Sequence, residues 1–293
     1  MPPIQHDYAN VNGVRLHYAH AGTGPLILFL HGFPEFWYAW KNQIEEFGRD
    51  HRAVAPDLRG YNLSDRPAEV KQYKAHVLVE DIRQLAAQFG PEKFVLVAHD
   101  WGGAVAWGLA IAYPELLHKL VIVNSPHPVA FARELAHNKA QQDASRYMNL
   151  LRSDKAERVL AENNFARLQK MALEGWCRGA PTPADRAAYI EAWSQAGALT
   201  GSLNYYRASP LYPPIGDDPG ARALQLDPAS FMVRVPTMAV WGMRDQALLP
   251  SILDGMEEWV PDLRIERLPE ASHWVMHEEP ERLNALIRNF IGG

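Results

Sequence analysis

The chain has 293 residues, and 47% of them are hydrophobic, so it can bury a large core and still carry an inserted segment. Its formal net charge is −5, and the 29 basic and 34 acidic residues are interspersed, which argues against a nucleic-acid partner or an anionic membrane surface. The first residues lack the pattern of a signal peptide, and no apolar run is long enough for membrane insertion. The single cysteine, Cys177, excludes an intrachain disulfide, and we interpret it as a small core residue. We therefore expect a cytoplasmic protein.

The predicted elements begin with a β-hairpin. Two alternating stretches meet at Asn12-Gly13, a pair that tolerates the positive φ of a tight turn. The run PLILFLHGF that follows is continuously apolar, as expected of a strand covered on both faces. Buried strands that alternate with helices predict an α/β fold with a mostly parallel, doubly wound sheet. Further strands of this type are predicted at 51–58, 93–100, 119–125, 237–242 and 263–268, with helical patterns between several of them, such as 78–89 and 103–113.

The alternation stops between about residues 129 and 230. This stretch contains no convincing buried strand, and its pattern is helical and rich in Ala, Arg, Glu and Gln. Prolines mark both of its ends, at Pro126 and Pro128 and again at 213, 214 and 219. We interpret residues 1–128 and 231–293 as one α/β core and residues 129–230 as a helical cap inserted into it.

The segment KFVLVAHDWGGAVAW carries the sharpest chemical signal. A buried strand ends at Asp100 and a helix follows at once, with Ala98 two residues before the aspartate and Gly102 two residues after it. This pattern of small residues around a central nucleophile is typical of a tight strand-to-helix turn that presents the central side chain above a sheet, at the N-terminus of a helix. A carboxylate there needs no base in order to attack an sp³ carbon, and the product would be an ester of the enzyme. Asp100 is therefore the predicted nucleophile, and the alternative is that it only caps the helix.

The other catalytic groups follow in the chain order nucleophile, acid, histidine. Asp245 comes just after the strand 237–242, and His273 comes just after the last strand. His273 would be the base of the hydrolytic step, and Asp245 would orient it and balance its charge. The backbone amides of Phe33 and Trp101 are the predicted oxyanion hole, and a cis bond between Phe33 and Pro34 would fix that turn.

Other histidines offer alternatives to this assignment. His31 and His99 flank the two turns, but the chain order disfavours both as the base. His273 and His277 have the i, i+4 spacing of a metal pair, although no third ligand is evident in the sequence. We predict no metal site.

Seven segments together resemble the soluble-type epoxide hydrolases of the α/β-hydrolase superfamily, and the resemblance covers essentially the whole chain. It implies an α/β-hydrolase fold, hydrolysis of an epoxide to a vicinal diol through a hydroxyalkyl ester on Asp100, and no cofactor. The segments are HGFPEFWYAW, APDLRGYNLSDRP, VAHDWGGAVAW, NSPHP, LNYYRAS, VWGMRD and EASHW.

The resemblance also implies that two cap tyrosines hold the epoxide oxygen, for which a phenol is a suitable proton donor. We assign them to Tyr206 of the NYYR segment and Tyr147 of SRYMNLL, with Tyr205 as the substitute for Tyr206. The aromatic turns suggest a mostly apolar pocket for a small alkyl or aryl epoxide. Its predicted substrate-binding residues are Phe33, Pro34, Trp37 and Trp101.

Three alternatives stay open. Haloalkane dehalogenases share the Asp-Trp turn, but Phe33 lacks the side-chain donor that they commonly use for halide, which leaves the Trp101 indole as the donor. The same fold also serves for ester or lactone hydrolysis. A catalytically idle binding relative is the third alternative, and such a protein would be expected to have lost one of the predicted catalytic residues, none of which is missing here.

Overall fold

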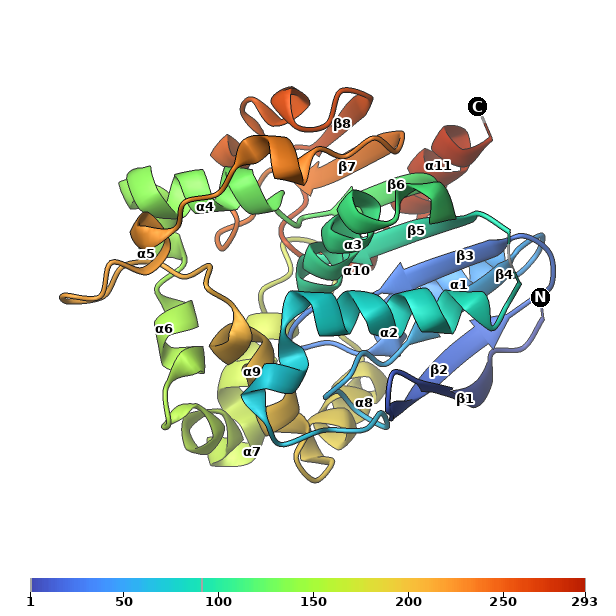
Figure 1. Cartoon of the computed structure of the whole chain (residues 1–293). Helices are drawn as coiled ribbons and strands as arrows, with labels where there is room; N and C mark the ends of the chain where they lie inside the picture. The colour runs from blue at the N-terminus through green and yellow to red at the C-terminus, as the bar shows by residue number, and fades with distance from the viewer. Residues whose placement is uncertain (1, 91, 293) are drawn as a thin grey trace.

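The described strands form one sheet in the computed structural model, which describes residues 2–90 and 92–292 (Figure 1). The strand order is β1-β2-β4-β3-β5-β6-β7-β8. The pairs β1–β2 and β2–β4 are antiparallel, and the pairs from β4 to β8 are parallel, which confirms the predicted sheet. The strands are β1 Gln5–Val11, β2 Val14–Ala21, β3 Leu26–Leu30, β4 Arg52–Pro56, β5 Phe94–His99, β6 Leu117–Val123, β7 Thr237–Gly242 and β8 Leu263–Leu268.

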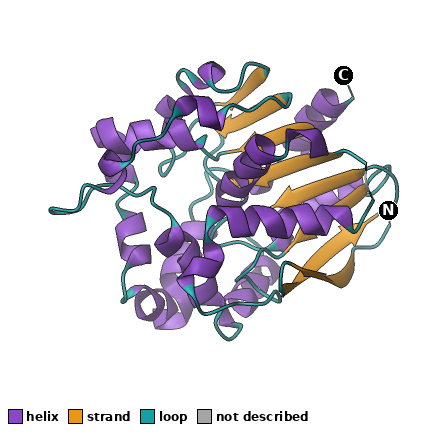
Figure 2. Ribbon diagram, viewed as in Figure 1, coloured by secondary structure: helices purple, strands orange, loops and turns teal. Residues whose placement is uncertain are grey.

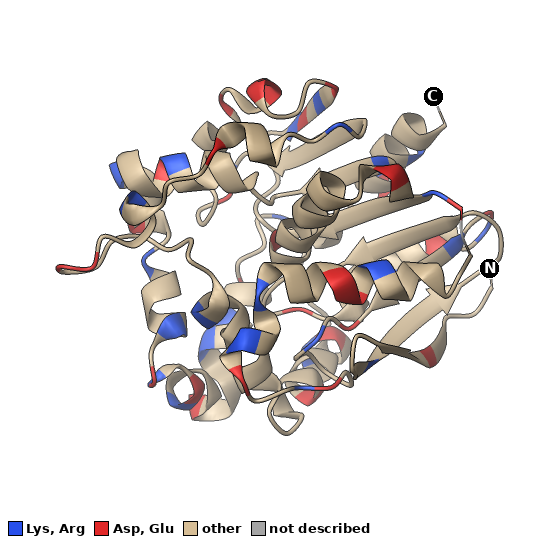
Figure 3. Ribbon diagram, in the orientation of Figure 1, with Lys and Arg blue, Asp and Glu red and all other residues tan. Residues whose placement is uncertain are grey.

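Helices cover both faces of the sheet, and a further group lies between β6 and β7 in the chain (Figure 2). None of the described helices has the length and apolar composition that a membrane span would need. Acidic and basic residues are mixed along these elements (Figure 3). The helices are α1 Lys41–Phe47, α2 Ala75–Ala87, α3 Asp100–Ala112, α4 Pro128–His137, α5 Lys139–Ala144, α6 Tyr147–Arg152, α7 Ala156–Ala172, α8 Pro183–Ser194, α9 Ala198–Ala208, α10 Val275–Glu278 and α11 Pro280–Ile291.

Alternate residues of the central strands supply two separate hydrophobic cores. Ile27 and Phe29 of β3 pack in a cluster that includes residues of α1 and α11, whereas Leu28 and Leu30 pack in the cluster of α2 and α3. Successive side chains of a strand point to opposite faces, so a run of apolar residues is what a doubly covered strand requires.

The predicted hairpin and strands are present, with one difference in burial. Asn12 and Gly13 have φ values of +43° and +76° between β1 and β2, as the hairpin prediction requires. The prediction of a continuously buried strand at 263–268 is wrong, because β8 is the edge of the sheet and only Leu268 in it is fully buried. The charged Arg264, Glu266 and Arg267 in this strand are consistent with an exposed edge.

The segment between β6 and β7 is helical, as predicted, but it is more divided than its periodicity suggests. The stretch from Phe131 to Leu151 forms three helices rather than one. Helix α7 contains a break, in which Asn163, Asn164 and Phe165 all have left-handed φ values between +52° and +59°. Tyr205 and Tyr206 lie together in α9, which packs against α6, α7 and α8.

Buried hydrogen bonds fix α8 and α9 to the sheet-bearing part of the protein. The Trp193 indole donates to the Pro34 carbonyl oxygen at 2.6 Å, and the Tyr205 hydroxyl donates to the Arg59 carbonyl oxygen at 2.9 Å. Arg59 is held in turn by Asp81 of α2, with Nε–Oδ2 and Nη2–Oδ1 distances of 2.7 and 2.6 Å. Because both side chains of this ion pair are almost completely buried, neither charge can turn to water if the other is removed.

We expect Asp81→Ala to lower the free energy of unfolding by about 3–5 kcal/mol, because it leaves the Arg59 guanidinium buried without its counter-charge. Denaturant unfolding measures this. Glu80→Ala is the matched control, because Glu80 is the neighbour of Asp81 in the same helix and its ion pair with Arg83 is more exposed. This substitution should lower the free energy of unfolding by less than about 1 kcal/mol. Equal losses in the two variants would contradict the prediction.

Candidate active site

Asp100 lies in a strained turn between β5 and α3. Its φ is +47°, a left-handed value that non-glycine residues adopt at a cost. A Cβ on Gly32 would lie 2.3 Å from the Asp100 Cβ, and a Cβ on Gly102 would lie 2.5 Å from the carbonyl oxygens of Leu30 and His31. The structure thus has the crowded turn that the pattern around Asp100 predicts, and glycine is required at both neighbouring positions.

One of the two predicted oxyanion-hole amides contacts the Asp100 carboxylate directly. The backbone N–H of Phe33 donates to Asp100 Oδ1 at 2.7 Å, and the Phe33–Pro34 bond is cis. The Trp101 amide belongs to the first turn of α3, and the Trp101 ring packs edge-on against Tyr206, with a distance of 5.0 Å between the ring centroids.

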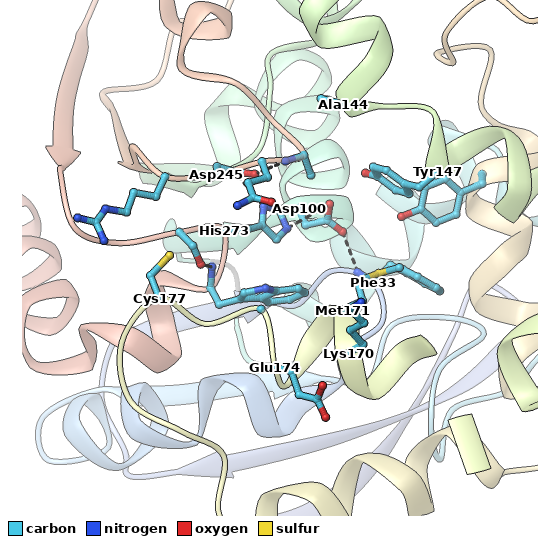
Figure 4. Close-up of a pocket in the computed structure, with 17 residues that line it drawn as sticks. Phe33, Asp100, Ala144, Tyr147, Lys170, Met171, Glu174, Cys177, Asp245 and His273 are labelled. Atoms are coloured by element: carbon cyan, nitrogen blue, oxygen red, sulfur yellow. Dashed lines mark hydrogen bonds and ion pairs between the residues drawn. The ribbon is translucent and has the colours of Figure 1, made fainter. Parts of the chain in front are cut away.

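His273 and Asp245 form a buried pair next to Asp100 (Figure 4). His273 Nδ1 donates to Asp245 Oδ2 at 2.7 Å, while His273 Nε2 lies 3.8 Å from Asp100 Oδ2. The other carboxylate oxygen of Asp245 accepts the backbone N–H groups of Ala247 and Leu248. The three residues predicted from chain order are therefore brought together, with the imidazole between the two carboxylates.

Burial and charge oppose one another at this pair. Burial alone would lower the pKa of His273, but the Asp245 carboxylate, assisted by Asp100 and Glu35, raises that pKa to about 9. Burial alone would raise the pKa of Asp245, but His273 and the donors on Leu248 and Asn124 hold it below its ordinary value. At neutral pH the pair is an imidazolium and a carboxylate.

Tyr147 and Tyr206 are neighbours in the wall of the cavity that contains Asp100. Their ring centroids are 6.3 Å apart in an edge-on arrangement, and both rings line the cavity wall. Burial raises the pKa of both hydroxyls, so each keeps its proton at neutral pH and can donate it. Tyr205 has a different position, because its hydroxyl donates to the Arg59 carbonyl oxygen.

The cavity has two lobes that share Asp100, Tyr147 and Tyr206. The larger lobe has a volume of about 650 Å³, and its wall includes the exposed charged residues Lys170, Glu174 and Arg244. The smaller lobe measures about 70 Å³ and is mostly apolar. Apolar surface predominates in both lobes, as expected, and the smaller lobe is lined in part by Trp101, Phe131, Met148, Leu211 and Leu248.

Two predicted substrate-binding residues lie elsewhere. The described residues that line the two lobes do not include Pro34 or Trp37. Trp37 begins the 3₁₀ helix η1 (Trp37–Trp40), where its amide donates to Asp57 Oδ1, and its ring packs edge-on against His6 at 4.8 Å. Cys177 is a further correction, because it is exposed on the wall of the larger lobe rather than buried in a core.

The other histidines have different partners. Fully buried His31 accepts the Leu58 amide at 3.0 Å, and burial lowers the pKa of His31. His99 donates through Nε2 to the backbone carbonyl oxygen of His273 at 3.0 Å, and its Nδ1 lies 3.2 Å from Glu35 Oε2. His277 Nε2 lies 2.6 Å from Glu35 Oε1, so His277 and His273 do not face a common site.

Sequence reasoning missed the support that lies behind the pair formed by His273 and Asp245. Asn124 donates through Nδ2 to Asp245 Oδ2 at 2.7 Å, and its own φ is +40°. Buried Glu35 also lies close to His99 and His277. The signal for Asn124 was its position directly after β6, because a polar residue at the carboxyl end of a buried parallel strand lies at the edge where such sheets gather their sites.

Removing the Asp100 charge should lower the pKa of His273 below about 9, because a nearby carboxylate stabilises the imidazolium. We expect the pKa of His273 to fall by on the order of one unit in Asp100→Asn. A ¹⁵N NMR titration of the histidine side chains measures it, and the His273 signal is identified by its absence from the spectrum of His273→Gln. Glu69→Gln, which changes an exposed carboxylate, should leave the titration unchanged. An unchanged His273 midpoint in Asp100→Asn would show that the two groups are not coupled.

Comparisons with known proteins agree with this fold. A profile described as the alpha/beta hydrolase fold matches residues 25–280. The chain is 39% identical to the AB hydrolase superfamily protein YfhM of Bacillus subtilis, over 99% of both chains. It is 35% identical to epoxide hydrolase 4 of Mus musculus, over 98% of this chain and 79% of that protein. A crystal structure of Bacillus megaterium epoxide hydrolase in complex with an inhibitor matches with 39% identity and a TM-score of 0.89, over 98% of this chain and all of that one. The chain belongs to the α/β-hydrolase fold family and, within it, to the epoxide hydrolases.

Proposed function

We propose that this enzyme converts an epoxide and water to a vicinal diol through a covalent hydroxyalkyl ester on Asp100. The observation that carries the proposal is the meeting, in one cavity, of the Asp100 carboxylate, two protonated tyrosines and a histidine paired with a second carboxylate. We further propose that residues 129–230 act as a cap, since they supply both tyrosines from α6 and α9.

The first half-reaction opens the ring. Tyr147 and Tyr206 donate hydrogen bonds to the epoxide oxygen, which takes up the developing negative charge and then a proton. Asp100 Oδ2 attacks one ring carbon from the side opposite the C–O bond that breaks, and an ester and a hydroxyl group form. Since the Phe33 amide already holds Oδ1, it directs the free oxygen toward the substrate.

The second half-reaction hydrolyses the ester. Once Asp100 is esterified its charge is lost, so the pKa of His273 falls, and the imidazolium gives up its proton, which replaces the proton that one phenol gave to the epoxide oxygen. The neutral His273 then removes a proton from water, the resulting hydroxide attacks the Asp100 carbonyl carbon, and the Phe33 and Trp101 amides stabilise the oxyanion. Collapse of this intermediate breaks the bond between the carbonyl carbon and the diol oxygen, which takes the second proton of the attacking water. The diol leaves, and Asp100 is again a carboxylate beside a protonated His273.

The two lobes suit a substrate with unlike ends. An alkyl or aryl group fits the smaller apolar lobe, and the larger lobe can accept a longer substituent. The same nucleophile would also displace halide from a haloalkane. However, the Phe33 side chain has no donor for halide and its amide is occupied by Asp100, which leaves only the Trp101 indole for a halide, whereas two phenols are in place for an epoxide oxygen. Epoxide opening is therefore the better-supported reaction.

The decisive experiment incubates the protein with alkyl and aryl epoxides beside haloalkanes and follows diol and halide separately. We expect diol without halide, and a loss of at least about 10⁴-fold in Asp100→Ala, because the nucleophile is gone. His273→Gln should instead stop after the first half-reaction, so that mass spectrometry of the intact protein finds one substrate added per chain. Halide without diol would make the enzyme a dehalogenase, and neither product from folded protein would favour a binding role.

The tyrosine assignment has its own test. Removing one hydroxyl in Tyr147→Phe or Tyr206→Phe should slow ester formation about tenfold, because the other donor remains, and the double variant should lose about 10³-fold or more. Single-turnover kinetics with one epoxide measure this step. Tyr205→Phe is the matched control, since it removes the adjacent hydroxyl, which bonds the Arg59 carbonyl oxygen, and it should reduce stability rather than the rate of ring opening. A fully active double variant would remove both tyrosines from the role.

A further inference from the structure

We infer that Asn124 is a positioning residue that fixes the Asp245 carboxylate and limits how strongly it holds the proton of His273. This role would make Asn124 a determinant of the pH at which His273 can act as a base. The inference rests on the proposed function for its kinetic part only.

The side chain of Asn124 contacts one carboxylate oxygen of Asp245 and the backbone amide of Gly242. Its Nδ2 donates to Asp245 Oδ2, the same oxygen that accepts His273 Nδ1–H, and both distances are 2.7 Å. Its Oδ1 accepts the Gly242 amide at 2.9 Å, at the end of the strand that leads to Asp245. The side chain therefore holds both the carboxylate and the backbone before it, and Asn124 is fully buried.

The backbone of Asn124 is shaped for this contact. The φ of +40° lies in the left-handed region, which asparagine tolerates better than most residues, and the Asn124 amide continues the β6–β7 ladder by donating to the Val240 carbonyl oxygen at 3.0 Å. The strained conformation thus occurs where the strand ends and the side chain must reach across to the next loop.

The shared oxygen explains the effect on His273. A carboxylate oxygen that accepts two donors divides its charge between them, so the Asn124 amide weakens the attraction between Asp245 and the imidazolium. Without this donor, Asp245 would stabilise the protonated form of His273 more strongly, and the histidine would lose its proton at higher pH. The other titratable groups near the pair are Asp100, His99, Glu35 and Tyr147. The side-chain hydrogen bonds of Asn124 go to Asp245 and Gly242 and to none of these four groups.

Ser125 provides a matched comparison one residue further along. Its hydroxyl donates to the backbone carbonyl oxygen of Asp100 at 2.6 Å, and it is as buried as Asn124. This hydrogen bond does not involve the Asp245 or His273 side chains. The two neighbours thus support opposite sides of the site, and only Asn124 should influence the proton on His273.

The test compares Asn124→Ala, Asn124→Gly and Ser125→Ala by ¹⁵N NMR titration of His273, which needs no substrate. We expect the midpoint of the His273 titration to rise by on the order of one pH unit in Asn124→Ala. It should rise as far in Asn124→Gly, which removes the same donor and adopts the φ of +40° without strain. Ser125→Ala should leave the midpoint unchanged even if it slows turnover. Asn124→Gly serves as the reporting variant if Asn124→Ala does not fold.

Single-turnover kinetics give the second readout. In the Asn124 variants the pH profile of ester hydrolysis should be shifted to higher pH. At neutral pH the rate of ester hydrolysis should fall about tenfold for each pH unit of this shift, while the rate of ester formation changes less. A midpoint that stays or falls in both Asn124 variants, or a rise of equal size in Ser125→Ala, would overturn the inference. If the unmodified enzyme forms no ester with any epoxide, the proposed function fails, and the NMR titration still decides the role of Asn124.

Discussion

The strained backbone at Asp100 is the constraint on which the rest of the site depends. A positive φ at this position is possible only because glycine at 32 and 102 leaves room for the turn, and because β5 and α3 are both packed into the core and hold its two ends. The strain puts the carboxylate within 2.7 Å of the Phe33 amide and beside the imidazole of His273. A relaxed turn would separate these groups, so the free energy stored in the backbone maintains the geometry that the proposed reaction needs.

The electrostatics of the site follow from the same geometry. Two carboxylates, Asp100 and Asp245, lie on either side of one imidazole in a place that is largely shielded from water. Such an arrangement is stable when the histidine carries a proton, and this is why its pKa is raised despite burial. Esterification of Asp100 would remove one of the two negative charges. The base would therefore become available only after the nucleophile had reacted, and this order would need no movement of the protein.

Much of this site was predictable from sequence because it depends on short local patterns. Apolar runs identified most of the strands, small residues around Asp100 identified the turn, and chain order identified Asp245 and His273. Burial at β8 was misjudged although the sequence held the signal, because the charged Arg264, Glu266 and Arg267 are typical of an exposed edge strand. Trp37 and Asn124 show a different limit, at the site. Both residues are close to key motifs in the chain. A turn after Pro34 directs the Trp37 ring toward His6, however, and the left-handed backbone of Asn124 directs its side-chain amide toward Asp245. Such contacts depend on backbone direction in three dimensions.

The adjacent tyrosines of α9 show how one helix can serve stability and chemistry together. Successive residues of a helix point about 100° apart, so Tyr205 and Tyr206 cannot face the same partner. Tyr205 bonds the carbonyl oxygen of Arg59, a residue that Asp81 fixes in the core, and the Tyr206 ring lies in the cavity wall. The anchor and the proposed donor are thus one residue apart on a rigid element, and any movement of α9 that displaced Tyr206 would also have to break a buried hydrogen bond. The ion pair between Arg59 and Asp81 therefore supports the position of Tyr206 near Asp100, although neither of its residues lines the two lobes of the cavity.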